Sequence, residues 1–93
     1  MDERSLHHTH PQIVKRLRRA EGHLRSVIAM IEAGRSCLDL AQQLHAVEKA
    51  VAEAKKTLIH DHIDHCLESA VNGGGGRPTR SVIGEFKSIS RYL

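Results

Sequence analysis

The chain has 93 residues and a formal net charge of +3, with one Phe, one Tyr and no Trp. This length predicts a single domain, residues 1–93, whose own core is marginal, so that oligomerisation is the expected source of stability. No apolar run approaches the length of a membrane span and no signal-peptide core is visible, which predicts a cytoplasmic protein with reduced thiols and no membrane partner. Walker and G-x-G-x-x-G motifs are absent, which argues against a nucleotide-binding fold.

The first ten residues are predicted to form a flexible arm that holds His7, His8 and His10. Their spacing is too irregular for a hexahistidine tag. The arm is either a solvated tail or a mobile segment that supplies an additional metal ligand. Both interpretations stay open at this point.

Residues 11–33 are predicted to form the first helix, because Pro11 fits a first helical turn and apolar residues recur at helical spacing. Residues 11–35 hold six basic and two acidic side chains, whereas residues 37–70 hold three basic and six acidic ones. A charge run is most often only a solvated face, but a basic stripe on a small symmetric oligomer also suits DNA binding. The candidate DNA contacts are Lys15, Arg16, Arg18, Arg19, Lys55 and Lys56. Aromatic residues are not interleaved with them, which argues against stacking on single strands.

The segment from Ser36 to Ala70 is predicted to form one long helix. Gly34 suits the end of the preceding helix, and Ser36 followed by Asp39 is typical of an N-cap. An apolar stripe recurs at steps of three and four: Leu40, Leu44, Val47, Val51, Ala54 and Leu58. Two further steps of four reach His62 and Cys66, so the stripe turns into two possible metal ligands one helical turn apart.

The other cysteine, Cys37, lies at the opposite end of this helix. At 1.5 Å per residue, Cys37 and Cys66 are about 43 Å apart on one straight helix, so one chain cannot join them through a metal or a disulfide. Two copies packed antiparallel would bring Cys37 of one chain to His62 and Cys66 of the other. The sequence therefore predicts a homodimer with two symmetric intersubunit sites.

These three residues offer two thiolates and one imidazole, a soft set that suits Cu(I), Zn(II) or thiolate-ligated Ni(II) and Co(II). Folding the chain back near Arg35 places residue 10 beside residue 60, which brings the histidine arm toward the ligand end of the helix. A fourth nitrogen from the arm would favour a four-coordinate divalent ion. His23 and His45 lie outside this cluster and are expected at the surface or the rim of the core.

The remaining chain is predicted to form a glycine-rich linker at residues 72–77 and a third helix at residues 78–91. Val82, Ile83, Phe86 and Ile89 give this helix an apolar stripe that should pack on the bundle. Glu85 lies on the same helix and is placed to reach the metal end.

Most of the chain resembles the CsoR/RcnR/FrmR family of small all-helical transcriptional repressors, through the Cys-x24-His-x3-Cys spacing and the run RLRRAEGHLRSVIAMIEAGRSCLDLAQQLHAVEKAVAEAKKTLIHDHIDHCLESAV. The resemblance implies an all-α fold with a three-helix protomer, an antiparallel four-helix-bundle dimer and a dimer of dimers. It also implies repression of metal efflux or detoxification genes, with release from operator DNA when metal binds. By resemblance, Cys37, His62 and Cys66 are the sensing ligands, Arg16 contacts DNA, and Glu85 matches a glutamate behind the ligands of the copper sensors.

Three departures from the family pattern bear on the effector. Ser36 stands where copper sensors commonly have tyrosine, Glu53 replaces a basic DNA-contact residue, and Asp2 stands where the formaldehyde-sensing branch has proline. The histidine arm is similar to that of the nickel and cobalt sensors. We therefore expect a metal-responsive repressor for Ni(II) or Co(II) first and Cu(I) second. A formaldehyde-responsive repressor, a metal-storage bundle without DNA binding, and a thiol enzyme using Cys37 are the further alternatives; the last lacks an evident oxyanion site.

Overall fold

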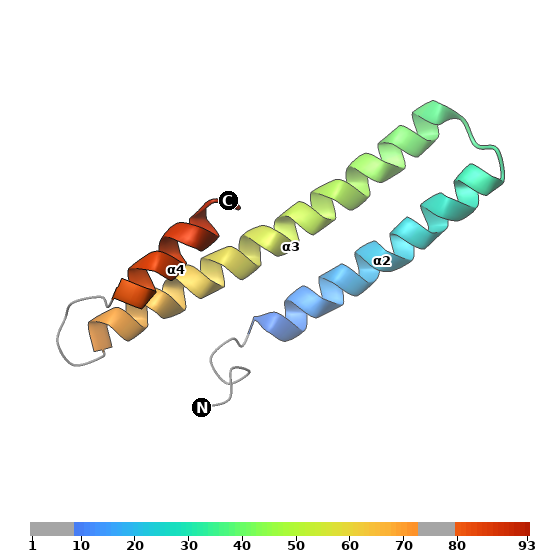
Figure 1. The fold of residues 1–93 in the computed structure, drawn as a ribbon. Coiled ribbons are helices and arrows are strands. Elements are labelled where there is room, and N and C mark those ends of the chain that lie inside the picture. The colour runs from blue at the N-terminus through green and yellow to red at the C-terminus, as the bar shows by residue number, and fades with distance from the viewer. Residues whose placement is uncertain (1–8, 73–79) are drawn as a thin grey trace. The chain divides into compact units, whose positions relative to one another are not determined.

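The computed structural model describes residues 9–72 and 80–93, and within these ranges the chain forms three helices and no strand. Helix α2 spans His10–Glu32, α3 spans Cys37–Asn72 and α4 spans Arg80–Ser90 (Figure 1). Each helix begins and ends close to its predicted boundaries, so the all-α prediction is confirmed. Among the described residues, no helix combines the length and the apolar character that crossing a membrane requires.

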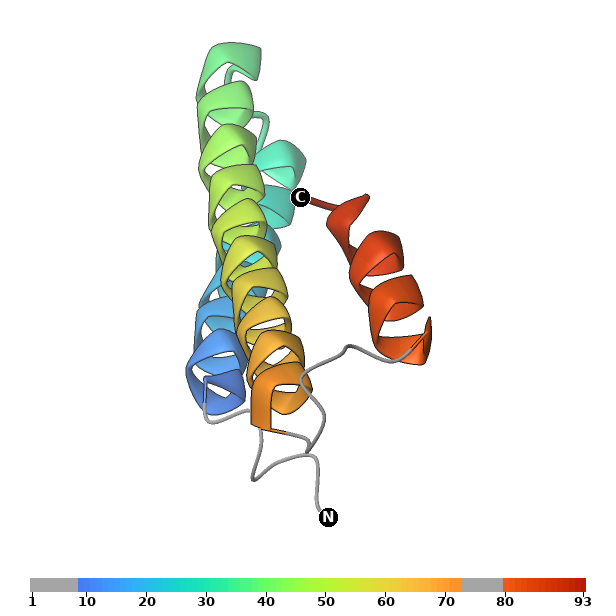
Figure 2. The same ribbon diagram turned by 90° about the vertical axis from the view of Figure 1, so that its left-hand side faces the viewer.

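Two compact units share helix α3. The hairpin unit, Pro11–Lys55, contains nearly all of α2 and the first part of α3, which run antiparallel from a tight turn (Figure 1). The terminal unit combines the beginning of the chain, up to His10, with Lys56–Leu93. In the terminal unit, α4 lies alongside the last part of α3 (Figures 1 and 2).

The turn of the hairpin unit is fixed by backbone hydrogen bonds. The Gly34 N–H donates to the Ile31 carbonyl at 3.1 Å, and the Arg35 N–H donates to the Met30 carbonyl at 3.0 Å. This pair of bonds is the Schellman motif, in which the residue after the helix adopts a left-handed conformation. Gly34 has a φ of 76°, which glycine adopts without a side-chain clash.

Helix α3 begins immediately after this turn with the predicted cap. The Asp39 N–H donates to Ser36 Oγ at 3.2 Å, and the Leu40 N–H donates to the Ser36 carbonyl at 3.0 Å. Ser36 is therefore the N-cap, as its sequence pattern predicts. The Asp39 carboxylate lies 3.6 Å from the Arg35 guanidinium, which adds an ion pair across the same turn. Cys37 is therefore the first residue of a helix whose start is stabilised by the Ser36 cap and by the Arg35–Asp39 ion pair.

The core of the hairpin unit is a narrow seam with a seven-residue spacing. Ile13, Ala20 and Val27 are buried on α2, and Val47 and Ala54 are buried on α3. Such spacing is typical of two helices packed like a coiled coil. Most other large apolar residues of the hairpin unit are exposed on a single chain: Val14, Leu17, Leu24, Ile28, Ile31, Leu44 and Val51. This is apolar surface that the predicted dimer would cover.

Among the described residues of the terminal unit, Ile59 and Asp61 on α3 are buried. Asp61 continues the seven-residue spacing of Val47 and Ala54, so a carboxylate occupies the position where the seam pattern calls for an apolar side chain. A buried polar group at such a position weakens packing but fixes the register of the helices.

Two segments predicted from the sequence lie partly outside the described residues. Of the arm, His7 and His8 are outside, whereas His10 is the first residue of α2. Of the glycine-rich linker, residues 73–77 are outside, and Asn72 is the last residue of α3 rather than the start of the linker.

Candidate metal centre and nucleic-acid interface

The three predicted sensing ligands are all carried by α3. The Cys37 thiol is exposed and forms no disulfide. It belongs to the hairpin unit, whereas His62 and Cys66 belong to the terminal unit. Cys66 lies on α3, but its side chain is outside the described part of the structure. Within residues 9–72 and 80–93 of one chain, no three His, Cys, Asp or Glu side chains are grouped to hold a metal. The intersubunit site therefore stays a prediction.

Helix α4 places a carboxylate against the candidate ligand His62. The Oε1 atom of Glu85 lies 3.1 Å from Nε2 of His62, and the His62 side chain is 23% exposed. A carboxylate on one ring nitrogen fixes the orientation and tautomer of an imidazole that binds metal through the other nitrogen. If His62 is a ligand, it would bind through Nδ1. The sequence placed Glu85 at the metal end without identifying its partner.

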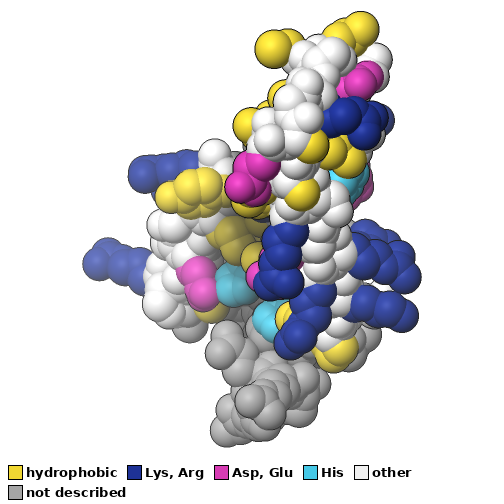
Figure 3. All heavy atoms as spheres, turned by 90° about the vertical axis from the view of Figure 1, so that its right-hand side faces the viewer, with side chains coloured by type: hydrophobic (Ala, Val, Ile, Leu, Met, Phe, Trp, Pro, Cys, Tyr) yellow, Lys and Arg dark blue, Asp and Glu magenta, His cyan; other side chains and the backbone are white. Residues whose placement is uncertain are grey.

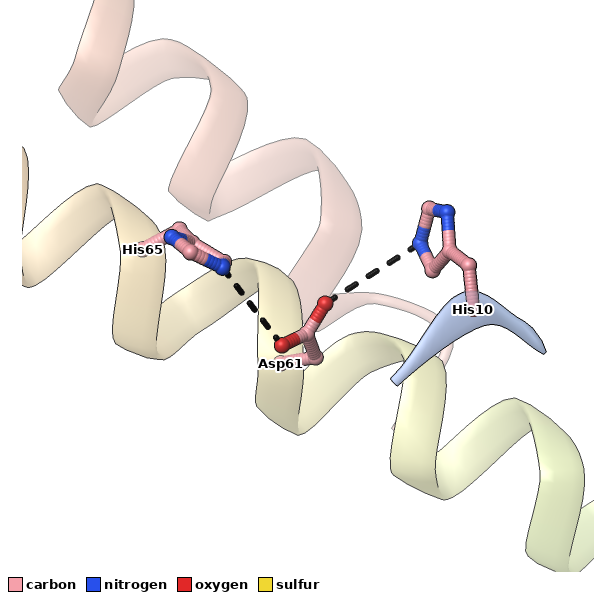
Figure 4. Close-up of polar contacts among 3 residues, drawn as sticks. All are labelled: His10, Asp61 and His65. Carbon is pink, nitrogen blue, oxygen red and sulfur yellow. Dashed lines mark ion pairs between the residues drawn. The ribbon is translucent and has the colours of Figure 1, made fainter. Parts of the chain in front are cut away.

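A second contact on α3 joins Asp61 to two histidines of the terminal unit (Figure 4). The Oδ1 atom of Asp61 lies 3.6 Å from Nε2 of His65, one turn further along α3. The Oδ2 atom lies 3.9 Å from Nε2 of His10. The predicted return of residue 10 to the neighbourhood of residue 60 is thereby confirmed. The Asp61 side chain is only 7% exposed, so these imidazoles face a mostly buried carboxylate.

Sequence reasoning missed Asp61, although two signals were available. The spacing of four to His65 predicts a same-face contact on a helix, and the spacing of seven from Ala54 predicts burial. A hollow of about 340 Å³ lies beside this carboxylate, lined by Thr9, Thr57, His60, Asp61, Asp64, His65 and Glu68. The Thr9 hydroxyl is buried, with no hydrogen-bond partner among the described residues.

The predicted DNA contacts are all exposed side chains. Lys15, Arg16, Arg18 and Arg19 follow one another on α2, and Lys55 and Lys56 lie on α3. Figure 3 shows lysine and arginine side chains projecting into solvent in this view. Arg25, further along α2, forms an ion pair with Glu21 at 3.6 Å.

A hollow of about 330 Å³ in the hairpin unit brings two of these arginines together. It is lined by Arg16, Arg19, Ala20, His23, Ala50 and Glu53. Glu53 therefore places a carboxylate in the same hollow as the two guanidinium groups, which lowers the positive potential available to a phosphate. His23 is half-buried, with Nε2 2.6 Å from Oε1 of Gln43, so it has a role in the hairpin and not in the ligand cluster.

Within the described residues the chain has helices and no strand, with candidate thiol and imidazole ligands on one long helix and basic residues on the first helix. These features are those expected of a small helical metal-sensing regulator. The comparisons with known proteins agree: the family described as metal-sensitive transcriptional repressor matches residues 9–91, and the chain belongs to that family. The family consists of repressors, which bind DNA, so the prediction that this protein is not an enzyme is confirmed.

Three similar proteins illustrate the relationship. The copper-sensing transcriptional repressor RicR of Mycobacterium tuberculosis is 41% identical over 85% of this chain and 82% of its own length. The copper-sensing transcriptional repressor CsoR of Bacillus subtilis is 35% identical, over 86% of this chain and 80% of its own length. The protein of the same name from Mycobacterium ulcerans is 36% identical over 69% of this chain and 55% of its own length. No solved structure matches the chain.

Proposed function

We propose that this protein is a Cu(I)-responsive repressor, which binds double-stranded operator DNA without metal and leaves it when Cu(I) binds. It would control genes for copper efflux or resistance. The observation that carries the proposal is the donor set on α3: two thiols and an imidazole, with the imidazole held by Glu85 at 3.1 Å. Cu(I) is satisfied by two thiolates and one imidazole. The copper-sensing relatives support this choice of metal.

The site would be shared between two chains. Cys37 of one chain and His62 with Cys66 of the other would supply the donors, in a homodimer or a dimer of dimers. The exposed apolar residues of the hairpin unit support such an assembly, because one chain leaves them uncovered. In each site Glu85 would orient His62.

Ni(II) or Co(II), the effectors favoured by the sequence, form the second candidate because the histidine arm could supply the additional donors that these ions need. His7 and His8 lie outside the described residues. His10, however, lies against Asp61 and is the first residue of a helix. That placement supports Cu(I) over Ni(II) and Co(II), because it gives His10 a different partner.

DNA would bind to the basic residues of α2, with Lys55 and Lys56 on α3. Release requires that the DNA-bound and free forms differ in their affinity for the metal, since an effector shifts an equilibrium only by that difference. The coupling is reciprocal, so DNA should weaken metal binding by the same factor.

The deciding experiment compares Cu(I), Ni(II) and Co(II) on the anaerobic protein, first by competition with a chelator and then by release from a promoter fragment. We expect Cu(I) to bind tightly and release DNA, in the wild type and equally in a variant with His7, His8 and His10 replaced by Ala. Strong loss of Ni(II)-driven release in this variant, with no release by Cu(I) in either protein, would instead establish the nickel sensor.

The shared site has its own test. Cys37→Ala chains mixed with Cys66→Ala chains should form heterodimers that keep one intact site of two. Each parent should bind no Cu(I) at these sites, although both should fold and dimerise. Heterodimers that bind no metal would contradict the cross-chain geometry.

A further inference from the structure

We propose that Asp61 is a selectivity residue, which holds His10 and His65 away from the sensing ligands and so keeps the site at three soft donors. This inference rests on the proposed function. It assigns a role in the choice of metal to a carboxylate that is itself no ligand.

The geometry of Asp61 allows it to hold both imidazoles at once. Its two carboxylate oxygens face different rings, Oδ1 toward His65 at 3.6 Å and Oδ2 toward His10 at 3.9 Å. Figure 4 shows the two rings on opposite sides of the carboxylate. Because the Asp61 side chain is 7% exposed, loss of an imidazole removes a polar partner from a mostly buried carboxylate.

Asp61 and His65 can influence the choice of metal because they directly precede the proposed ligands His62 and Cys66 on α3. Asp61 directly precedes His62 and His65 directly precedes Cys66, so two parallel pairs run along α3, one turn apart within each pair. Successive residues of an α-helix differ by about 100° in direction. The pair Asp61 and His65 is therefore displaced around the helix from the ligand pair His62 and Cys66. His65 is the imidazole next to the ligand pair that a metal could recruit.

A metal that recruits His10 or His65 as a fourth donor would have to take that imidazole from Asp61. Doing so leaves a mostly buried carboxylate with one partner fewer, which is unfavourable. Cu(I) needs no fourth donor and avoids that cost, whereas Ni(II) and Co(II) incur it. The contact thus penalises the divalent ions without touching the Cu(I) ligands.

In this proposal the cluster acts by holding imidazoles and not by binding a divalent metal. Within the described residues no three His, Cys, Asp or Glu side chains are grouped to hold a metal, and the two rings flank the carboxylate from opposite sides (Figure 4). Asp61 in this arrangement binds the two imidazoles, and its removal should make His10 and His65 available as metal ligands.

The test measures metal affinities of Asp61→Asn and of Asp64→Asn, an exposed aspartate on the same helix that lines the same hollow. We expect Asp61→Asn to raise Ni(II) affinity about tenfold, the change that loss of one buried polar interaction produces. Cu(I) affinity should stay within about twofold, and Asp64→Asn should change neither. Adding His10→Ala and His65→Ala to Asp61→Asn should return Ni(II) affinity to the wild-type value.

Unchanged Ni(II) affinity in a folded Asp61→Asn protein would overturn the proposal, as would a gain that persists when both histidines are removed. If Asp61→Asn does not fold, the double variant His10→Ala, His65→Ala with Asp61 intact is measured instead. Its Ni(II) affinity should equal that of the wild type, and a loss would show that these histidines are already ligands. A wild type that binds no Cu(I) refutes the proposed function separately, since the Ni(II) comparison does not depend on it.

Discussion

Replacement of Glu85 tests whether α4 prepares the candidate metal ligand. Glu85→Ala removes the carboxylate that lies 3.1 Å from His62 Nε2. Loss of such a supporting group typically weakens metal binding 10- to 100-fold. Because the Glu85 side chain is 58% exposed, solvent screens part of the interaction and the low end applies. We expect about a tenfold loss of Cu(I) affinity, or about 1.4 kcal/mol.

The assay is competition with a Cu(I) chelator under anaerobic conditions, together with the metal concentration that half-releases promoter DNA. Glu85→Gln should lose less than Glu85→Ala, because the amide oxygen can still accept a hydrogen bond from the ring. Glu68→Gln, an exposed carboxylate on α3, serves as the control for charge alone. Metal-free DNA affinity should be the same in all of them. Wild-type Cu(I) affinity in Glu85→Ala would show that the carboxylate does not orient a ligand.

Two further predictions concern the hairpin unit. Arg16→Ala should weaken DNA binding and reduce the slope of log affinity against log salt by about 0.9 for each phosphate that the variant no longer neutralises. Arg25→Ala, which breaks an ion pair on the same helix, should change the slope less. Equal slopes for the two variants in gel-shift titrations would show that Arg16 is not part of the DNA-binding surface. Gly34→Ala should lower the free energy of unfolding by about 1 kcal/mol, because φ is 76° there, and Gly22→Ala should raise it by about 0.5–1 kcal/mol, because Gly22 lies within a helix and has open space around it; thermal unfolding of both variants checks the difference.

The helices and their ends could be predicted because their determinants are local. Gly34 and Ser36 act through backbone geometry and a hydrogen bond within a few residues, so the sequence alone places the turn and the start of α3. Apolar spacing likewise identifies the apolar side of each helix, which on α3 includes Leu44, Val47, Val51 and Ala54. Spacing does not determine which of these residues α2 covers: Val47 and Ala54 are buried in one chain, whereas Leu44 and Val51 are exposed.

The partners of polar side chains could not be predicted in the same way. Folding the chain back at the turn placed residue 10 near residue 60, but the contact of His10 with Asp61 depends on three-dimensional distances of a few ångströms. Charge counting treated Asp61 as one acidic residue among six, although it is mostly buried. The sequence placed Glu85 on the third helix without a partner, and only the packing of α4 on α3 assigns it to His62.

The capped turn before Cys37 has a consequence for the speed of the response. Its hydrogen bonds and the Arg35–Asp39 ion pair exist before any metal arrives, so the backbone that carries this thiol needs no folding step to receive an ion. The corresponding His62 ring is already held by Glu85. Metal capture by such preformed parts costs little conformational entropy, and far-ultraviolet circular dichroism should hardly change on loading. If Cys37 and His62 are the ligands, as proposed, binding of a metal would not have to wait for these two segments to refold.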